Sequence, residues 1–302
     1  MTRSDSPTLS VVVPSVNGWQ DLRACLEAID LAGRSIPLEV IVPERCGARE
    51  RAELSRHFPA VRVIPVAPDT SIPRMRALAF GAAAAPTVAV IEDHILVKST
   101  WACRIEELRA AGHRVIGGRV ENAATERAVD CAAFLCEYHG VLRVRAAGVA
   151  QSLIGNCTAY DRKLLRHFEH VIDRGGWEDS LHDAMQTAGV ELWYDPTLVV
   201  RHRRVYHSAS EYARERFNFS RAWAAMHTAS SGSGRRLWLG ARAALLPPLL
   251  LFRILTYTWS QRTNRMALLR SLPFLPLFIG SWALGELVGT WSGDGGALAK
   301  VR

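Results

Sequence analysis

Residues 87–94 contain the first group of side chains whose types and spacing suggest chemistry. A short run of apolar and β-branched residues from Thr87 to Ile91 breaks abruptly into Glu92, Asp93 and His94. The run suits a buried strand of a parallel sheet. Adjacent ionised carboxylates are costly in apolar packing, so the three polar side chains are expected where the strand ends and a loop begins. By themselves they fit a divalent-cation site and a solvated acidic turn equally well. An imidazole ligand would favour Mn²⁺ over Mg²⁺.

A second pair of acids, Glu178 and Asp179, opens a predicted helix over residues 177–188. A carboxylate in this place could act as the general base that takes a proton from an attacking hydroxyl group. Acids are also common at helix starts, where they cap the first N–H groups and interact favourably with the helix dipole. Both interpretations stay open for Glu178 and Asp179.

The elements that must position these acids alternate between strands and helices. Hydrophobic periodicity and turn residues predict strands at 9–14, 38–42, 61–66 and 87–91, and helices at 19–31, 48–57, 72–84 and 101–111. Further strands are expected at 115–120 and 191–201, and helices at 177–188 and 206–229. Such alternation predicts an α/β fold of parallel βαβ units, in which ligands bind at the carboxyl ends of the strands.

Composition indicates a globular protein with an anionic partner. The chain has 302 residues, 49% of them hydrophobic, and a net charge of +8. This excludes a disordered protein and leaves nucleic acid, anionic lipid or a phosphorylated small molecule as partners. The six cysteines include no C-x-x-C pair, which favours reduced thiols over disulfides or a zinc site. No signal peptide opens the chain, so we expect the catalytic part on the cytoplasmic side.

The C-terminal part has a different character. A linker is predicted at 230–236, between a globular domain at 1–229 and an apolar region at 237–302. Residues 237–259 and 266–291 are each long enough to span a bilayer, which requires roughly 20 residues. We therefore expect a transmembrane hairpin of two helices. The alternative is a pair of helices in the membrane interface, because Arg242 and Arg253 interrupt the first segment and the connecting loop carries two further arginines.

Taken in order, these motifs resemble the family 2 glycosyltransferases, which have the GT-A nucleotide-diphospho-sugar transferase fold. The resemblance covers about residues 9–225. It is carried by residues 14–17, Glu44, Arg76, residues 92–94, residues 155–156, residues 160–162, residues 177–182 and residues 216–221. The chain departs from the usual pattern at Glu44, where Asp is commoner, and at His94, where the last Asp of a D-x-D motif is usual.

The resemblance implies a metal-assisted, inverting transfer of a hexose from a UDP- or GDP-sugar to a lipid or lipid-linked acceptor. The residues implied in donor binding are Pro14, Ser15, Asn17, Glu44, Arg76, Glu92, Asp93 and Asn156. Mn²⁺ or Mg²⁺ would be held by Asp93 and His94, although which of the residues 92–94 bind the metal stays open. The register of the family places Glu178, slightly ahead of Asp179, at the position of the catalytic base. Arg216, Arg221 and His202 are candidates for the acceptor or a phosphate group.

Two other functions are alternatives to this one. The departures at Glu44 and His94 leave room for a catalytically silent relative that acts as a membrane scaffold in polysaccharide or glycolipid assembly. A dinucleotide-dependent oxidoreductase would need a G-x-G-x-x-G motif after a strand, and residues 14–18 lack it. Aromatic residues among the arginines of 206–229 carry no nucleic-acid motif, so no nucleic acid is expected as a partner.

Overall fold

The computed structural model describes residues 6–229, 232–261 and 264–302. The chain forms two compact units. Unit 1 comprises residues 1–121 and 144–203, and unit 2 comprises residues 122–143 and 204–302. The helices at the C-terminal end thus group with α5 (Ala128–Tyr138) and α9 (Ala209–Thr228) in unit 2. The linker predicted at 230–236 stays a prediction, since residues 230–231 lie outside the described residues and a helix begins at Ser233.

Unit 1 is built on a mixed sheet whose first four strands are parallel. Their order is β3 (Arg62–Pro65), β2 (Leu38–Glu44), β1 (Leu9–Val12) and β4 (Thr87–Val90). Antiparallel pairing then continues the sheet through β8 (Thr158–Asp161) and β6 (Val115–Asn122). The long strand β9 (Leu192–His202) follows, with β5 (Ile95–Val97) and β7 (Gly148–Ala150) paired to it. This arrangement confirms the predicted α/β class.

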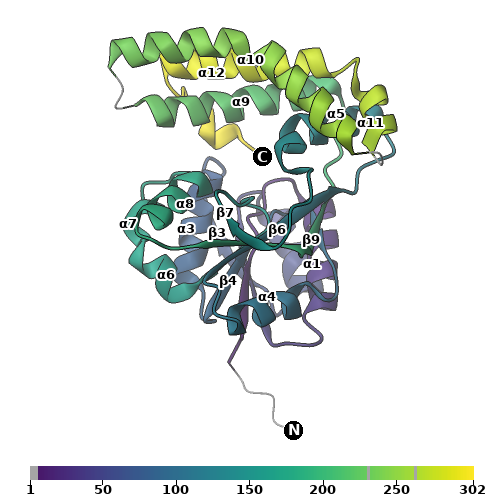
Figure 1. The fold of residues 1–302 in the computed structure, drawn as a ribbon. Helices are drawn as coiled ribbons and strands as arrows, with labels where there is room; N and C mark the ends of the chain where they lie inside the picture. Colours follow the sequence, from purple (N-terminus) through teal and green to yellow (C-terminus); the bar gives the residue numbers. More distant parts are fainter. Residues whose placement is uncertain (1–5, 230–231, 262–263) are drawn as a thin grey trace. The chain divides into compact units, whose positions relative to one another are not determined.

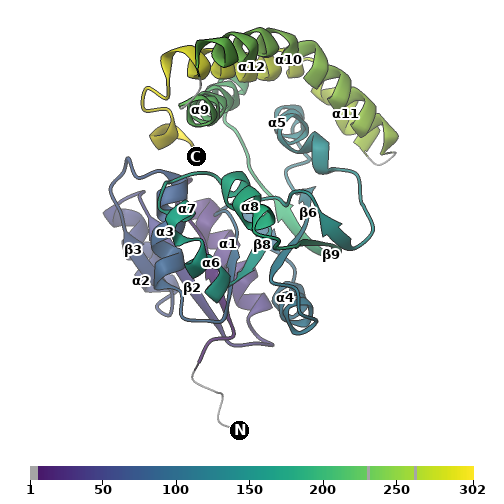
Figure 2. The ribbon, with the colours of Figure 1, turned by 60° about the vertical axis from the view of Figure 1, so that its left-hand side comes forward.

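Helices flank this sheet on both faces (Figure 2). They are α1 (Trp19–Ala32), α2 (Ala48–His57), α3 (Ile72–Ala82), α4 (Trp101–Ala110), α6 (Arg162–His167), α7 (Glu169–Ile172) and α8 (Glu178–Thr187). On one face, α3, α6 and α8 pack their apolar residues into a core with β1, β2, β4 and β9. The strands β1 and β4 are fully buried, which explains why their apolar residues run continuously and do not alternate with polar ones.

Most predicted elements are present within a few residues of their predicted bounds. The short strands β5 and β7 are not predicted by the sequence, because three residues carry too little periodicity. Of the two predicted apolar helices, the first is α10 (Ser233–Ser260). The second is broken into α11 (Arg265–Ser271) and α12 (Leu275–Ser292), which meet at 74°. By length and composition α10 could cross a membrane, and so could the bent pair if it is one span.

Unit 2 is a group of helices in which α12 packs lengthwise on α9 (Figure 1). The Tyr212 and Phe278 rings lie 4.5 Å apart, and the Arg216 guanidinium lies 4.2 Å from the Trp282 ring. Further along, Gly289 of α12 faces the main chain of α9. The contacts advance in the same direction along both helices, so α9 and α12 are parallel neighbours.

Two glycines of α12 let the two backbones approach closely. A Cβ at Gly285 would collide with Ser220 and with the carbonyl of Phe217, and a Cβ at Gly289 would collide with the carbonyl of Arg221. They are four residues apart and so share one helix face. Small residues with this spacing allow close helix packing.

We predict that Gly289→Ala destabilises unit 2, because a methyl group there must push α12 away from the main chain of α9. Overpacking of this kind costs about 1–3 kcal/mol in unfolding free energy. The matched control is Gly280→Ala, also in α12, where a Cβ meets nothing within 4 Å. That change should stabilise the helix by up to about 1 kcal/mol. Thermal unfolding of the two purified variants tests the contrast; equal unfolding temperatures would contradict it.

Candidate functional site

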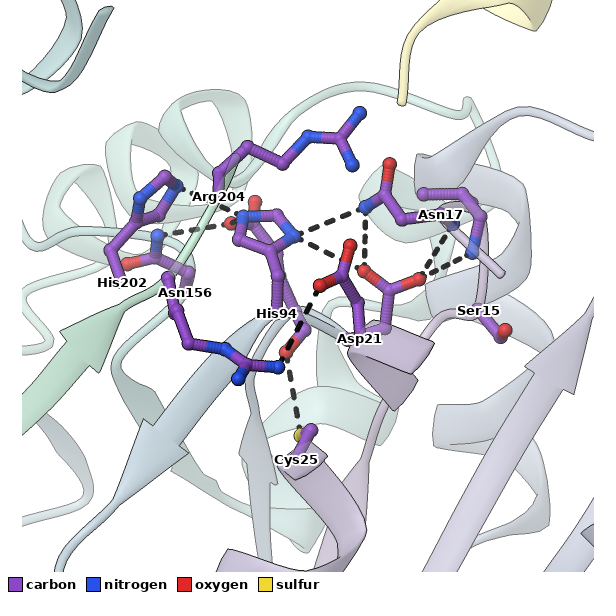
Figure 3. A network of polar contacts seen from close by, with 12 residues as sticks. Ser15, Asn17, Asp21, Cys25, His94, Asn156, His202 and Arg204 are labelled. Carbon is purple, nitrogen blue, oxygen red and sulfur yellow. Dashed lines mark hydrogen bonds and ion pairs between the residues drawn. The ribbon is translucent and has the colours of Figure 1, made fainter. Parts of the chain in front are cut away.

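The carboxyl ends of β1, β2 and β4 bring several predicted site residues of unit 1 together. The loop after β1 supplies Asn17, the end of β2 supplies Glu44, and the turn after β4 supplies residues 92–94. Asn156 precedes β8, and His202 ends β9. Figure 3 shows Asn17 on one side of His94 and both Asn156 and His202 on the other. These residues come from distant parts of the sequence, and the sheet order is what makes them neighbours.

Asp93 is fully buried, and its carboxylate holds the loop after β1. Asp93 Oδ2 accepts hydrogen bonds from the main-chain N–H groups of Val16 and Asn17 at 2.7 and 2.8 Å. Asn17 Nδ2 donates to Oδ1 at 2.6 Å. Burial by itself would raise the pKa of Asp93, but hydrogen bonds from His94, Val16 and Asn17 hold that pKa below its usual value. Asp93 is therefore an ionised anchor of this loop.

His94 lies between the two acids and is almost fully buried. Its Nδ1 is 3.1 Å from Asp93 Oδ1, and its Nε2 is 3.4 Å from Glu92 Oε2. Burial by itself would lower the pKa of His94, but these two carboxylates raise it to about 10. His94 thus carries a positive charge that compensates the two acids. Without such a charge, two carboxylates in this buried place would repel each other.

A group of three side chains has the arrangement of a metal site. Ligand atoms of Glu92, His94 and His202 all lie within 4.8 Å of one another. The two Nε2 atoms of His94 and His202 face each other at 2.9 Å. Two imidazoles and one carboxylate form a donor set that suits Mn²⁺ and other first-row transition metals better than Mg²⁺. These residues therefore fit a divalent cation.

The candidate metal group in the structure overlaps only in part with the predicted pair of Asp93 and His94. The sequence interpretation paired Asp93 with His94 and placed His202 on the acceptor side. In the structure the Asp93 carboxylate is occupied by Val16 and Asn17, while His202 pairs with His94. The register Ile95↔His202 between β5 and β9 places His202 there. In the sequence, His202 is marked only by its place directly after the strand predicted at 191–201.

Arg76 of α3 joins this group to the predicted base. Its guanidinium is buried and lies 2.5 Å from Glu178 Oε2 and 3.7 Å from Glu92 Oε1. Asn156 Nδ2 donates to Glu92 Oε2 at 3.0 Å. Glu178 also packs directly on the main chain of Gly155, where a Cβ would collide with its carboxylate. A continuous polar chain thus runs from His202 to Glu178.

Glu178 and its neighbour Asp179 have different surroundings. Glu178 and Arg76 line a small pocket of about 30 Å³, together with aromatic and apolar side chains that include Phe80, Tyr160 and Trp177. Asp179 Oδ1 instead accepts a hydrogen bond from the main-chain N–H of Ser180 at 2.7 Å, within the first turn of α8. Glu178 thus faces the pocket, and Asp179 bonds within its own helix.

Glu44, Ser15 and Pro14 lie on the β2 side of the cluster. Glu44 is fully buried; it accepts from the Gly47 N–H at 2.7 Å and pairs with Arg51 at 2.8 Å. Ser15 forms an isolated parallel β-bridge with Glu44, and the preceding residue, Pro14, is buried. Glu44 therefore shapes the loop that leads into α2, and its carboxylate is already paired.

Arg216 and Arg221 belong to unit 2, where both make local contacts. The Arg216 guanidinium is buried between the rings of Phe219 and Trp282, at 4.2 Å from each. Arg221 Nε donates to the carbonyl oxygen of Gly293, just after α12, at 3.0 Å. These contacts show structural roles for both arginines in holding α12 against α9.

Comparison with known proteins identifies the class of fold. No protein-family model matches the chain, and no curated protein matches it by sequence. Among solved structures, the chain resembles the mannosyltransferase PcManGT from Pyrobaculum calidifontis, solved in complex with GDP-Man and Mn²⁺. The TM-score is 0.58 at 15% sequence identity, over 96% of this chain and 88% of that chain. The chain therefore has the α/β fold of a glycosyltransferase, as the sequence predicted.

The two acids after β4 are expected to respond differently to neutralisation. Asp93→Asn replaces an acceptor of several N–H groups by an amide and should cost about 1–3 kcal/mol in unfolding free energy. Glu92→Gln, at a partly exposed position, should unfold at a temperature close to that of the parent but bind Mn²⁺ at least about tenfold more weakly. Thermal unfolding and Mn²⁺ titration measure the two effects. Equal losses of Mn²⁺ affinity with intact stability in both variants would contradict the assignment of Asp93 as an anchor.

Proposed function

We propose that this protein is an inverting glycosyltransferase that moves a hexose from a GDP- or UDP-sugar to a lipid or lipid-linked acceptor. The observation that carries the proposal is the continuous polar chain His202–His94–Glu92–Arg76–Glu178 at the carboxyl ends of the parallel strands. It joins a fitting cation site to a carboxylate that lines a cavity. The order of motifs typical of family 2 supports membership of that family.

The donor is proposed to bind at the strand ends of unit 1. A divalent cation bound there, which we propose to be Mn²⁺, would neutralise the charge that grows on the leaving diphosphate. Glu92, His94 and His202 would hold it, and Asp93 would keep Asn17 and the loop after β1 in place. Pro14, Ser15 and Glu44 would shape the nucleotide pocket on the β2 side. Asn156 orients Glu92.

Glu178 is proposed as the general base, because its carboxylate lines the cavity. The acceptor hydroxyl oxygen would attack the anomeric carbon, the bond from this carbon to the diphosphate would break, and the hydroxyl proton would pass to Glu178. Attack opposite the leaving group inverts the configuration. Arg76 would position Glu178 for this step, since its buried guanidinium is paired with that carboxylate.

The lipid nature of the acceptor rests on unit 2. Its apolar helices α10 and α12 offer a surface that a soluble acceptor does not require, and we propose that the enzyme works at the cytoplasmic face of the cell membrane. Arg216 and Arg221 of the same unit are less suited to bind a lipid phosphate than the sequence suggested, because both are engaged in packing.

The donor is tested by a thermal-shift screen of nucleotide sugars with and without Mn²⁺. GDP-mannose is the first compound to try, since the structural neighbour binds it. We expect one GDP- or UDP-sugar to raise the unfolding temperature in the presence of Mn²⁺, and His202→Ala to abolish the Mn²⁺-dependent part of the shift. No shift with any donor would favour the rival function of a catalytically silent membrane scaffold.

The base is tested by comparing Glu178→Gln with Asp179→Asn in an assay of nucleotide release with acceptor present. General base catalysis typically contributes 10²–10⁴-fold, so Glu178→Gln should lower kcat by at least about 100-fold. The donor-induced thermal shift should persist, because the donor does not need this carboxylate. Asp179→Asn is the matched control and should lose much less activity. A larger loss of kcat in Asp179→Asn than in Glu178→Gln would show that Asp179 is the base.

A further inference from the structure

The exposed apolar side chains of this protein gather on the last helices of unit 2. Among the described residues, most of the large hydrophobic side chains that are exposed lie on α10, α11 and α12. On α10 they include Leu245, Leu249 and Phe252, and on α12 they include Leu277, Leu284 and Leu287. Exposed apolar patches of this kind mark surfaces that contact a membrane or another protein. Figures 1 and 2 show α10 and α12 side by side, with α9 and α5 on one side of the pair.

The exposed residues of α12 form one stripe. Leu277, Leu284, Leu287 and Trp291 are three, four or seven residues apart and therefore share a helix face. The face that carries Gly285 and Gly289 is a different one and is covered by α9. α12 thus has one face on a polar helix and another that is apolar and exposed.

Its neighbour α9 is too polar to lie at the same depth in a bilayer. Phe278 to Gly289 of α12 lie against residues 212–221 of α9. This stretch of α9 contains Arg214, which is exposed, and Glu215. If α12 crossed a bilayer, these charges would be drawn into the hydrocarbon with it, at a cost on the order of 3 kcal/mol each. The contact between the two helices therefore argues against a transmembrane α12.

The charges of α10 argue in the same direction. Arg242 and Arg253 stand on either side of the middle of this 28-residue helix, which is about 42 Å long. A perpendicular helix centred in a hydrocarbon core roughly 30 Å thick would bury both arginines. Arg235, Arg242 and Arg253 are seven and eleven residues apart, so they line one side of the helix. Leu245 and Phe252 lie on a different side. An apolar face flanked by arginines is typical of a helix that lies in the membrane interface.

The surroundings of the apolar surface are cationic. After residue 231 the sequence has two acids, Glu286 and Asp294. The Glu286 carboxylate accepts a hydrogen bond from Trp282 Nε1 at 2.8 Å and lies 3.8 Å from Arg242. Arg235, Arg253, Arg265 and Arg270 add positive charge along α10 and α11. This charge complements a surface of anionic lipid headgroups.

We propose that α10, α11 and α12 lie in the plane of an anionic membrane surface, with their apolar faces immersed in one leaflet, and do not cross it. This departs from the hairpin of two transmembrane helices that the sequence predicted. The arginines contact the headgroups, and α9 stays on the aqueous side of α12. In this arrangement the protein attaches to the membrane without a helix that crosses it. The proposal goes beyond the proposed sugar transfer and does not depend on it.

Topology is tested with Ser260→Cys in the full chain, at the exposed end of α10. Sealed membrane vesicles with unit 1 outside are treated with a membrane-impermeant maleimide, and mass spectrometry compares labelling at position 260 with labelling of Cys103, a partly exposed thiol of unit 1. An in-plane arrangement predicts labelling at both positions in intact vesicles. Labelling at position 260 only after detergent is added would show a transmembrane hairpin and overturn the proposal.

The surface itself is tested by flotation of the full chain with vesicles of phosphatidylcholine, with or without phosphatidylglycerol. We expect binding that needs phosphatidylglycerol and weakens with salt. The double variant Arg242→Gln, Arg253→Gln should bind about fivefold more weakly per arginine removed. The double variant Leu245→Asp, Phe252→Asp should lose most of its binding to either vesicle.

The matched control is Leu31→Asp, since Leu31 is a comparably exposed leucine of unit 1. It should bind vesicles as the parent does, and all variants should show the parent's unfolding temperature. The proposal fails if the parent does not bind vesicles and the double variant Leu245→Asp, Phe252→Asp converts a dimer into a monomer. The apolar surface would then contact a second copy of the chain. None of these measurements uses a sugar donor. Failure of the membrane proposal can therefore be distinguished from failure of the proposed sugar transfer.

Discussion

The arrangement of unit 1 depends on how two adjacent acids are accommodated at the end of a buried strand. Glu92 and Asp93 follow β4 after one residue, Ile91, and Asp93 is completely buried. Ionised carboxylates in such a place are stable only when they are paired and hydrogen-bonded. His94 provides the positive charge, Asn17 and the main chain after β1 provide N–H donors, and Arg76 approaches Glu92 from α3. The loop after β1, helix α3 and strand β9 are thus all tied to these two acids.

The same balance of charge suits the binding of a divalent cation. His94 is protonated in the protein alone because two carboxylates surround it. A metal ion bound by Glu92, His94 and His202 would take over this positive charge, and the imidazole would give up its proton to become a ligand. The metal would then serve the fold as well as the proposed chemistry, because it compensates the same acids.

Unit 2 follows a different rule, since close contact of backbones organises it. Gly285 and Gly289 let α12 approach the main chain of α9, and Arg221 reaches the carbonyl after α12. A polar helix is thereby joined to an apolar one along their length. An amphipathic pair of this kind has one side suited to water and one suited to lipid, which is the basis of the proposed position at a membrane surface.

The sequence alone determined the local structure and the class of fold. Continuous β-branched runs such as that of β4, helical periodicity such as that of α1, and the alternation of the two predicted an α/β protein, and the structure confirms this class. It also singled out Glu92, His94 and Glu178, because polar residues at strand and helix ends stand out from an otherwise apolar pattern, and the structure joins these side chains in one network.

Tertiary structure alone decided which of these side chains meet. His202 reaches His94 through the pairing of β5 with β9, and Arg76 bridges Glu92 and Glu178 from a third element. Residues separated by about a hundred positions or more leave no local signal of such contacts. For the same reason the sequence could not show that α12 packs on charged α9. The apolar composition of α12 is compatible with crossing a membrane and with lying upon it, and the proposal of the second arrangement rests on its neighbour in space.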